Sequence, residues 1–129
     1  MKMSGAEELN KWTKQADHDL QMAKNIIEGG GYDTCAFLCQ QALEKYLKAL
    51  YIRKKKANPP KTHYLDELAR DLACSDDLQA IAKELSADYM ISRYPDAANA
   101  APFEEYTEAD AKAKLKKTKK AISWVRQQL

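Results

Sequence analysis

The sequence predicts an all-α protein, an up-and-down antiparallel four-helix bundle with one short additional helix. Three observations favour this class. Apolar side chains recur every three or four residues over several long stretches, which is the period of an amphipathic helix. No stretch alternates apolar and polar residues for more than a few positions, so no strand is expected. Glycine, proline and capping residues separate the periodic stretches, as the connections between neighbouring helices in a bundle require.

The first helix is predicted over residues 6–28 and ends at the three consecutive glycines Gly29, Gly30 and Gly31. Glycine disfavours a continued helix and readily supplies the left-handed residue of a C-cap. A phosphate-binding glycine loop is the alternative, but no Lys-Ser or Lys-Thr pair follows and no strand precedes. The short connection makes the first two helices an antiparallel hairpin.

The longest uninterrupted helical pattern is Tyr32–Lys55. Its apolar stripe is wide, so this helix needs neighbours on more than one side, and Cys35, Cys39 and Ala42 should be core. A second set of side chains is polar and forms either a solvated face or the wall of a site: Gln40, Gln41, Glu44, Lys45 and Lys48.

The three cysteines are predicted to be reduced core thiols, because their number is odd and two of them lie four residues apart on one helix. A metal site would need Cys35 and Cys39 together with His18 or His63. Their spacing matches no common zinc motif, so we expect neither a metal site nor a cofactor.

A basic cluster, Arg53 to Lys56, ends the central helix and is followed by the two prolines Pro59 and Pro60. Cations in the last turn of a helix complement its dipole, so the cluster is either a helix cap or an attractor of phosphates. Thr62 is placed to cap a short helix over about Tyr64–Cys74.

Ser75 opens the fourth helix, which leads into the irregular segment Ser92–Tyr106, where prolines break the periodicity. A loop of that length in a compact domain is either functional or mobile. It contains Arg93 and Tyr94 in the string SRYPDA. Arg93 either caps the end of the fourth helix, with Pro95 fixing a bend, or contacts a ligand.

Thr107 and Asp110 form the pattern of a capping box at the start of the last helix, which runs to Leu129. The outer face of that helix is rich in lysine. Such a face is usually solvated, although it would also suit RNA or an acidic partner.

The chain of 129 residues is long enough for one domain, residues 1–129, with a single core. A formal net charge of +2 is too small to indicate a nucleic-acid binder by electrostatics alone. We see no signal-peptide pattern and no apolar run of membrane-spanning length, so we expect a cytoplasmic protein without membrane contact.

Several stretches, taken in order, resemble the HEPN domain, a family named for its occurrence in higher eukaryotes and prokaryotes. They are WTKQADHDLQMAKNII, YDTCAFLCQQALEKYLKAL, KTHYLDEL, and DYMISRYPDA followed by YTEADA. The resemblance covers most of the chain. It implies a five-helix bundle similar to the C-terminal domain of aminoglycoside nucleotidyltransferases, commonly dimeric. Proteins that look like this are often encoded beside a minimal nucleotidyltransferase, in two-component systems of toxin–antitoxin type.

Many members of the family it resembles are metal-independent ribonucleases, with an arginine and a histidine four to six residues apart near the last helices. This chain departs from that pattern. Its two histidines are His18 and His63, and the nearest arginine before His63 is the distant Arg53. A ribonuclease of that kind needs its histidine close to the scissile bond. We therefore assign no catalytic residue and do not expect this type of catalysis.

The resemblance also implies nucleotide binding, which requires cations for the phosphates and an aromatic or guanidinium surface for the base. His63 has a second interpretation as a side chain that hydrogen-bonds the backbone near a helix start. The family's motif positions and the residue types together give our candidate ligand-binding set: Glu44, Lys45, Lys48, His63, Arg93 and Tyr94.

The leading hypothesis is a nucleotide-binding or partner-binding module that forms a homodimer and accompanies a minimal nucleotidyltransferase, with a nucleotide or RNA as ligand. One alternative is a ribonuclease toxin with a non-standard set, Glu44, Lys48 and Arg93. Another is a non-catalytic dimeric interaction protein whose dimer surface would be furnished by aromatic residues: Tyr46, Tyr51, Tyr89, Tyr94 and Phe103. We expect the Glu44 and Lys48 side of the central helix to face the Arg93 loop or a dimer partner.

Overall fold

The computed structural model describes residues 5–129, which contain helices and no strand. The helices are α1 (Gly5–Ile26), α2 (Tyr32–Lys55), α3 (Leu65–Asp71), α4 (Asp76–Ile91), α5 (Pro102–Glu105) and α6 (Glu108–Gln128). The predicted all-α class is confirmed. The four-residue helix α5 is an addition, and it lies within the segment that the sequence predicts as irregular.

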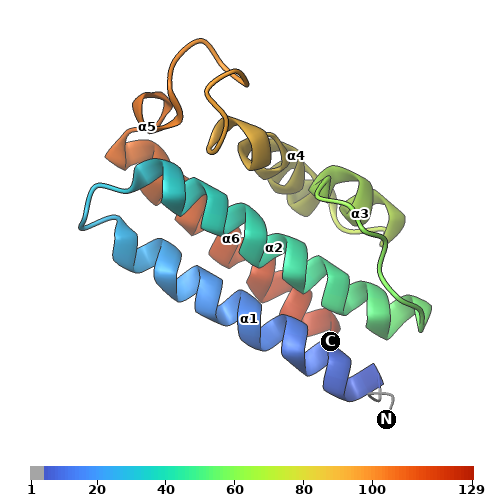
Figure 1. Cartoon of the computed structure of the whole chain (residues 1–129). Coiled ribbons are helices and arrows are strands. Elements are labelled where there is room, and N and C mark those ends of the chain that lie inside the picture. The colour runs from blue at the N-terminus through green and yellow to red at the C-terminus, as the bar shows by residue number, and fades with distance from the viewer. Residues whose placement is uncertain (1–4) are drawn as a thin grey trace.

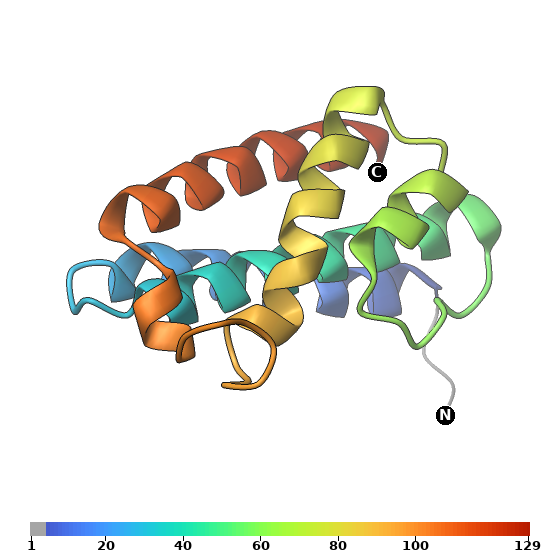
Figure 2. The same cartoon turned by 90° about the horizontal axis from the view of Figure 1, so that it is seen from above.

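The central position of α2 organises the bundle, because this helix contacts each of the other five (Figure 1). Helices α1 and α2 form the predicted antiparallel hairpin, and α6 packs along α2 and also contacts α1. Helix α4 crosses α2 and α6 at a steep angle, with α3 beside it over the second half of α2 (Figure 2). No helix within residues 5–129 is long and apolar enough to cross a membrane.

The core is built around α2, whose Leu43, Leu47 and Leu50 are fully buried. Leucines of α3 and α4 and apolar residues of α6 pack on them. The predicted core positions Cys35, Cys39 and Ala42 are also fully buried, and all three cysteines are free, as expected. A hydrogen bond with Cys35 and burial both raise the pKa of Cys39, which keeps this thiol protonated and unreactive.

The glycine connection between α1 and α2 acts as predicted and has a second function. Gly30 has φ +79°, the left-handed conformation that ends a helix without strain. Gly31 is needed for close packing, because a Cβ there would lie 2.4 Å from Cγ1 of Ile26. The two glycines thus allow α2 to turn back tightly against α1.

Of the three residues predicted to begin helices, Ser75 and Thr107 are N-caps. Ser75 Oγ accepts a hydrogen bond from the Leu78 amide at 3.3 Å, and Thr107 forms a complete capping box with Asp110. The prediction that Thr62 caps α3 is wrong. Helix α3 begins at Leu65, too far along the chain for Thr62, whose Oγ1 instead accepts from the Tyr64 amide.

A tertiary contact replaces the missing cap of α3. Ser86 Oγ, on α4, accepts a hydrogen bond from the Leu65 amide at 3.2 Å. Satisfying an N-terminal amide of α3 from α4 fixes the two helices against each other. This contact holds the segment before α3, which carries His63, in place against α4.

A buried ionic cluster anchors the end of α4 to α6. Asp88 is almost fully buried, accepts a hydrogen bond from Tyr106 Oη at 2.7 Å, and lies 2.8 Å from Lys114 Nζ. Burial raises the pKa of Asp88. Burial opposes a charged Lys114, but Asp88 and Glu84 outweigh it and raise the lysine's pKa. Lys114 therefore does not belong to a solvated lysine face, contrary to the simplest reading of α6.

Replacing Lys114 by methionine leaves the Asp88 carboxylate buried without its cation. We expect a loss of about 3 kcal/mol in unfolding free energy at pH 7, because an uncompensated buried charge is costly. Burial raises the pKa of Asp88 in the folded state, and the loss of Lys114 removes an opposing effect, so the folded variant binds a proton more readily than the unfolded chain does. The deficit should therefore shrink as pH falls toward about 4. Urea unfolding at several pH values measures both effects.

The matched control is Lys112→Met, because Lys112 is exposed and its one ion pair within residues 5–129 is with Glu108, at 3.7 Å. Its effect should stay below about 0.5 kcal/mol. Equal losses for the two variants, or a Lys114→Met deficit that grows on acidification, would contradict the anchoring function of the cluster.

Candidate functional site

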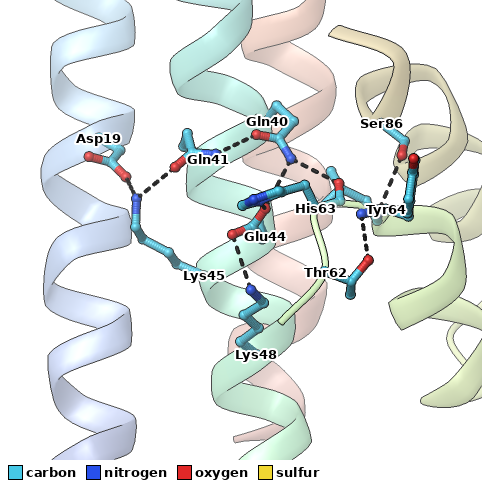
Figure 3. Close-up of polar contacts among 11 residues, drawn as sticks. Asp19, Gln40, Gln41, Glu44, Lys45, Lys48, Thr62, His63, Tyr64 and Ser86 are labelled. Atoms are coloured by element: carbon cyan, nitrogen blue, oxygen red, sulfur yellow. Dashed lines mark hydrogen bonds and ion pairs between the residues drawn. The ribbon is translucent and has the colours of Figure 1, made fainter. Parts of the chain in front are cut away.

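The site is centred on Glu44, whose side chain lies in the middle of α2 and is 5% exposed (Figure 3). Its Oε1 lies 2.8 Å from His63 Nδ1 and accepts a hydrogen bond from Gln40 Nε2 at 3.2 Å. Its Oε2 lies 3.3 Å from Lys48 Nζ. Both carboxylate oxygens are therefore satisfied, as a charge at this depth requires.

Gln40 holds Glu44 and the His63 segment together. It is fully buried, and its Nε2 donates both to Glu44 and to the backbone carbonyl of His63, the latter at 3.1 Å. Gln41 donates to Gln40 Oε1 at 2.7 Å, which fixes the orientation of the Gln40 amide. The network thus positions the backbone and the ring of His63 at once (Figure 3).

His63 lies just before α3, outside any helix, and its side chain is 48% exposed. Its ring stacks on Tyr89 of α4, with centroids 4.1 Å apart and planes 11° apart. An ionised carboxylate only accepts hydrogen bonds, so Nδ1 carries the hydrogen and Nε2 bears the lone pair of a neutral ring. The prediction that His63 merely bonds a backbone group does not describe this geometry.

The two lysines of the candidate set lie three residues apart on α2 and both contact α1, but they have different charged partners. Lys48 is buried beside Glu44, with its Nζ 5.6 Å from the ring centroid of Trp12 on α1. Lys45 forms an ion pair with Asp19 of α1 and a weak hydrogen bond to Gln41 (Figure 3). Lys45 therefore joins α1 to α2 and is linked to the Glu44 and His63 site only indirectly, through Gln41 and Gln40.

Arg93 occupies an aromatic setting at the end of α4. Its Cζ lies 4.8 Å from the ring centroid of Phe37, 5.4 Å from that of Tyr89 and 5.2 Å from that of Tyr94. Within residues 5–129 no carboxylate lies within ion-pair distance of its guanidinium, and its side chain forms no hydrogen bond. An exposed guanidinium held by cation–π contacts keeps its donors available.

A notch of about 180 Å³ opens beside His63 and Tyr89. Two of its apolar side chains are unusually open to solvent, Tyr64 at 62% and Met90 at 49% exposure. Lys61, Thr62 and Ser86 supply its polar rim. A flat apolar group with an anionic end matches this lining.

The structure brings Glu44, Lys48 and His63 into direct contact, and it links His63 to Arg93 through the ring of Tyr89. Glu44 does not contact Arg93 directly, because His63 and Tyr89 lie between them. Sequence reasoning missed Phe37 and Tyr89 as site residues. Helical spacing was the available signal, since Phe37 precedes Glu44 by two turns and Tyr89 precedes Arg93 by one.

Comparison with known proteins finds a matching family model and several similar solved structures. The model of the HEPN domain matches residues 9–128. The crystal structure of TT1696 from Thermus thermophilus is 31% identical, with a TM-score of 0.86 over 95% of this chain and 98% of that one. The structure of ST0689, an archaeal HEPN homologue, is 32% identical, with a TM-score of 0.76 over 94% and 97%. None of the curated proteins matches.

Replacing Tyr89 by leucine should remove the ring stacked on His63 while keeping apolar bulk at the position. The stacked ring shields the imidazole protons, so their NMR signals should move downfield in the variant. The signals of His18, which lies exposed on α1, should not move and serve as the internal control. Unchanged His63 signals would show that the stack does not form in solution.

Proposed function

The chain belongs to the HEPN domain family, and on that premise we propose that it is a nucleotide-binding module that accompanies a small nucleotidyltransferase. The observation that supports this most is the guanidinium of Arg93. It is exposed, is held by three aromatic rings, and has no carboxylate partner within residues 5–129. Such a cation is ready to receive an anionic ligand.

The phosphates of a nucleotide would bind to Arg93. A guanidinium offers a rigid fork of donors that matches phosphate oxygens, and it keeps its charge at any physiological pH. Rings behind the guanidinium hold it in place, so less side-chain entropy is lost on binding. Lys61, on the rim of the notch, adds a second cation.

The base would enter the notch between Tyr64 and Met90, whose apolar surfaces are exposed. Stacking of a base on an aromatic side chain contributes roughly 1–3 kcal/mol and tolerates different bases. The ring pair of His63 and Tyr89 forms the adjoining wall. The site thus combines the two kinds of contact that nucleotides need.

Burial argues against the alternative of a ribonuclease that uses Glu44, Lys48 and Arg93. Glu44 and Lys48 are buried and paired with each other, and only Arg93 is exposed to a large substrate. A binding module needs Arg93 and the notch alone. We therefore favour binding over cleavage.

The partner part of the proposal rests on the family and on exposed apolar side chains. Tyr64, Met90, Tyr94 and Phe103 are large hydrophobic residues open to solvent. Their exposure suits contact with a nucleotidyltransferase or with a second copy of this chain.

The free buried cysteines suit a reducing compartment, which supports a cytoplasmic location.

Nucleoside triphosphates should raise the melting temperature of the wild-type protein, because a ligand of the native state adds about 2.7 kcal/mol at 100 times its Kd. Arg93→Ala should weaken binding about tenfold or more, since a hydrogen bond to a charged group contributes roughly 1.5–3 kcal/mol. Arg53→Ala is the comparison variant, because Arg53 is also exposed but belongs to the basic cluster at the far end of α2, the other candidate attractor of phosphates. No shift with wild-type protein, or equal weakening by both variants, would refute the nucleotide site.

A complex with a small nucleotidyltransferase should form on co-expression and be weakened by Phe103→Ser, since Phe103 is 71% exposed and loses apolar area on that change. Size-exclusion chromatography with light scattering measures the masses of the complex and of the chain alone. Ala113→Ser, at an exposed position on α6, is the control substitution. A chain that elutes alone in every mixture would contradict the partner proposal.

A further inference from the structure

His63 is oriented more firmly than nucleotide binding requires. Its backbone carbonyl is fixed by Gln40, its Nδ1 by the buried carboxylate of Glu44, and its ring plane by Tyr89. Its side chain is nevertheless about half exposed. A wall residue of a binding notch would not need this degree of orientation.

The contact with Glu44 decides which ring nitrogen can react. Because Nδ1 donates its hydrogen to the carboxylate, the lone pair of the neutral ring is on Nε2. No side chain within residues 5–129 forms a hydrogen bond with that nitrogen. If Nε2 attacks an electrophile, the ring becomes positive and the neighbouring carboxylate stabilises the charge.

The polar rim of the notch suits a phosphoryl group. Lys61 provides a cation, and Thr62 and Ser86 provide hydroxyl groups. Each hydroxyl oxygen already accepts a hydrogen bond from a backbone amide, so its own hydrogen remains to be donated. Donors and a cation that line the same notch as a nucleophilic histidine are the groups that would hold the oxygens of a transferred phosphoryl group.

We propose that His63 is a phosphoryl acceptor that is modified at Nε2 by a donor with a high-energy phosphoryl bond, a phosphoramidate or an acyl phosphate. Nε2 forms a bond to phosphorus, and the bond from phosphorus to the leaving group breaks. The leaving group departs with the electron pair as an amine or a carboxylate. The Nδ1 hydrogen stays in its hydrogen bond with Glu44, which is a positioning residue here.

The second histidine of the chain is a built-in control. His18 lies on the exposed face of α1, with no hydrogen bond, ion pair or ring contact to the described chain. Both histidines react with the same donor in the same mixture, so only their surroundings in the protein differ. Incubation of the intact chain with potassium phosphoramidate, and separately with acetyl phosphate, distinguishes the two donor types.

We expect His63 to be phosphorylated at least about tenfold faster than His18. Losing the partner that orients a metal-binding histidine typically costs 10–100-fold in affinity or activity, and we expect an effect of the same order here. Peptide mass spectrometry at alkaline pH gives the two rates. NMR of the modified protein should place the phosphorus on Nε2 of His63. His63→Gln should abolish the fast reaction and leave the slow one at His18.

Glu44→Gln tests the positioning step. The change should slow His63 about tenfold and give a mixture of Nδ1 and Nε2 products, because the ring is no longer held in one tautomer. A merely structural carboxylate would leave the product ratio unaltered. If the variant does not fold, as circular dichroism would show, the wild-type rates and the site of phosphorylation still decide.

Equal rates at His18 and His63, or a product on Nδ1 of His63, would overturn the proposal. The reaction contains no nucleotide, so its result is independent of nucleotide binding. A failure here leaves the proposed function standing, and a failure of the melting experiments leaves the phosphoryl acceptor standing.

Discussion

A carboxylate in the middle of a core helix must be neutralised and hydrogen-bonded, because burying a charge costs several kcal/mol even after relaxation. Glu44 meets this requirement with Lys48 on one oxygen, and with Gln40 and His63 on the other. The contact with His63 pulls the segment before α3 onto α2 and sets its ring against α4. One buried charge thus determines where three parts of the chain meet and what they expose.

Helix α2 can hold a buried, paired carboxylate because other helices pack around it. It contacts all the other helices, and its leucines form the centre of the core. The polar set of α2 therefore divides according to its neighbours. Lys45 is directed to Asp19 of α1, whereas Gln40, Glu44 and Lys48 serve the site. A second buried ion pair, Asp88 with Lys114, fixes the end of α4 from which Arg93 projects.

The exposed side of the site contrasts with its buried base. Within residues 5–129 every buried charge has a partner of opposite charge. By contrast, the guanidinium of Arg93 contacts only aromatic rings, and Nε2 of His63 has no hydrogen-bond partner in the same part of the chain. Orientation by neighbours combined with unused polar groups is typical of sites that bind or react. The two proposals share the notch and Lys61 but depend on different groups, the guanidinium of Arg93 and Nε2 of His63.

Hydrophobic periodicity and helix-ending residues were sufficient to predict the bundle, the glycine turn, the reduced cysteines and the capping boundaries at Ser75 and Thr107, because these features depend on residues close together in the chain. The motif positions also gave six candidate site residues, of which the structure brings Glu44, Lys48 and His63 together. The long-range contacts that position these residues could not be predicted. Ser86 replaces a local cap on α3, Tyr89 joins His63 to Arg93, and Lys114 pairs with the buried Asp88. These pairs lie on different helices, and only the packing of α4 across α2 and α6 brings them within reach.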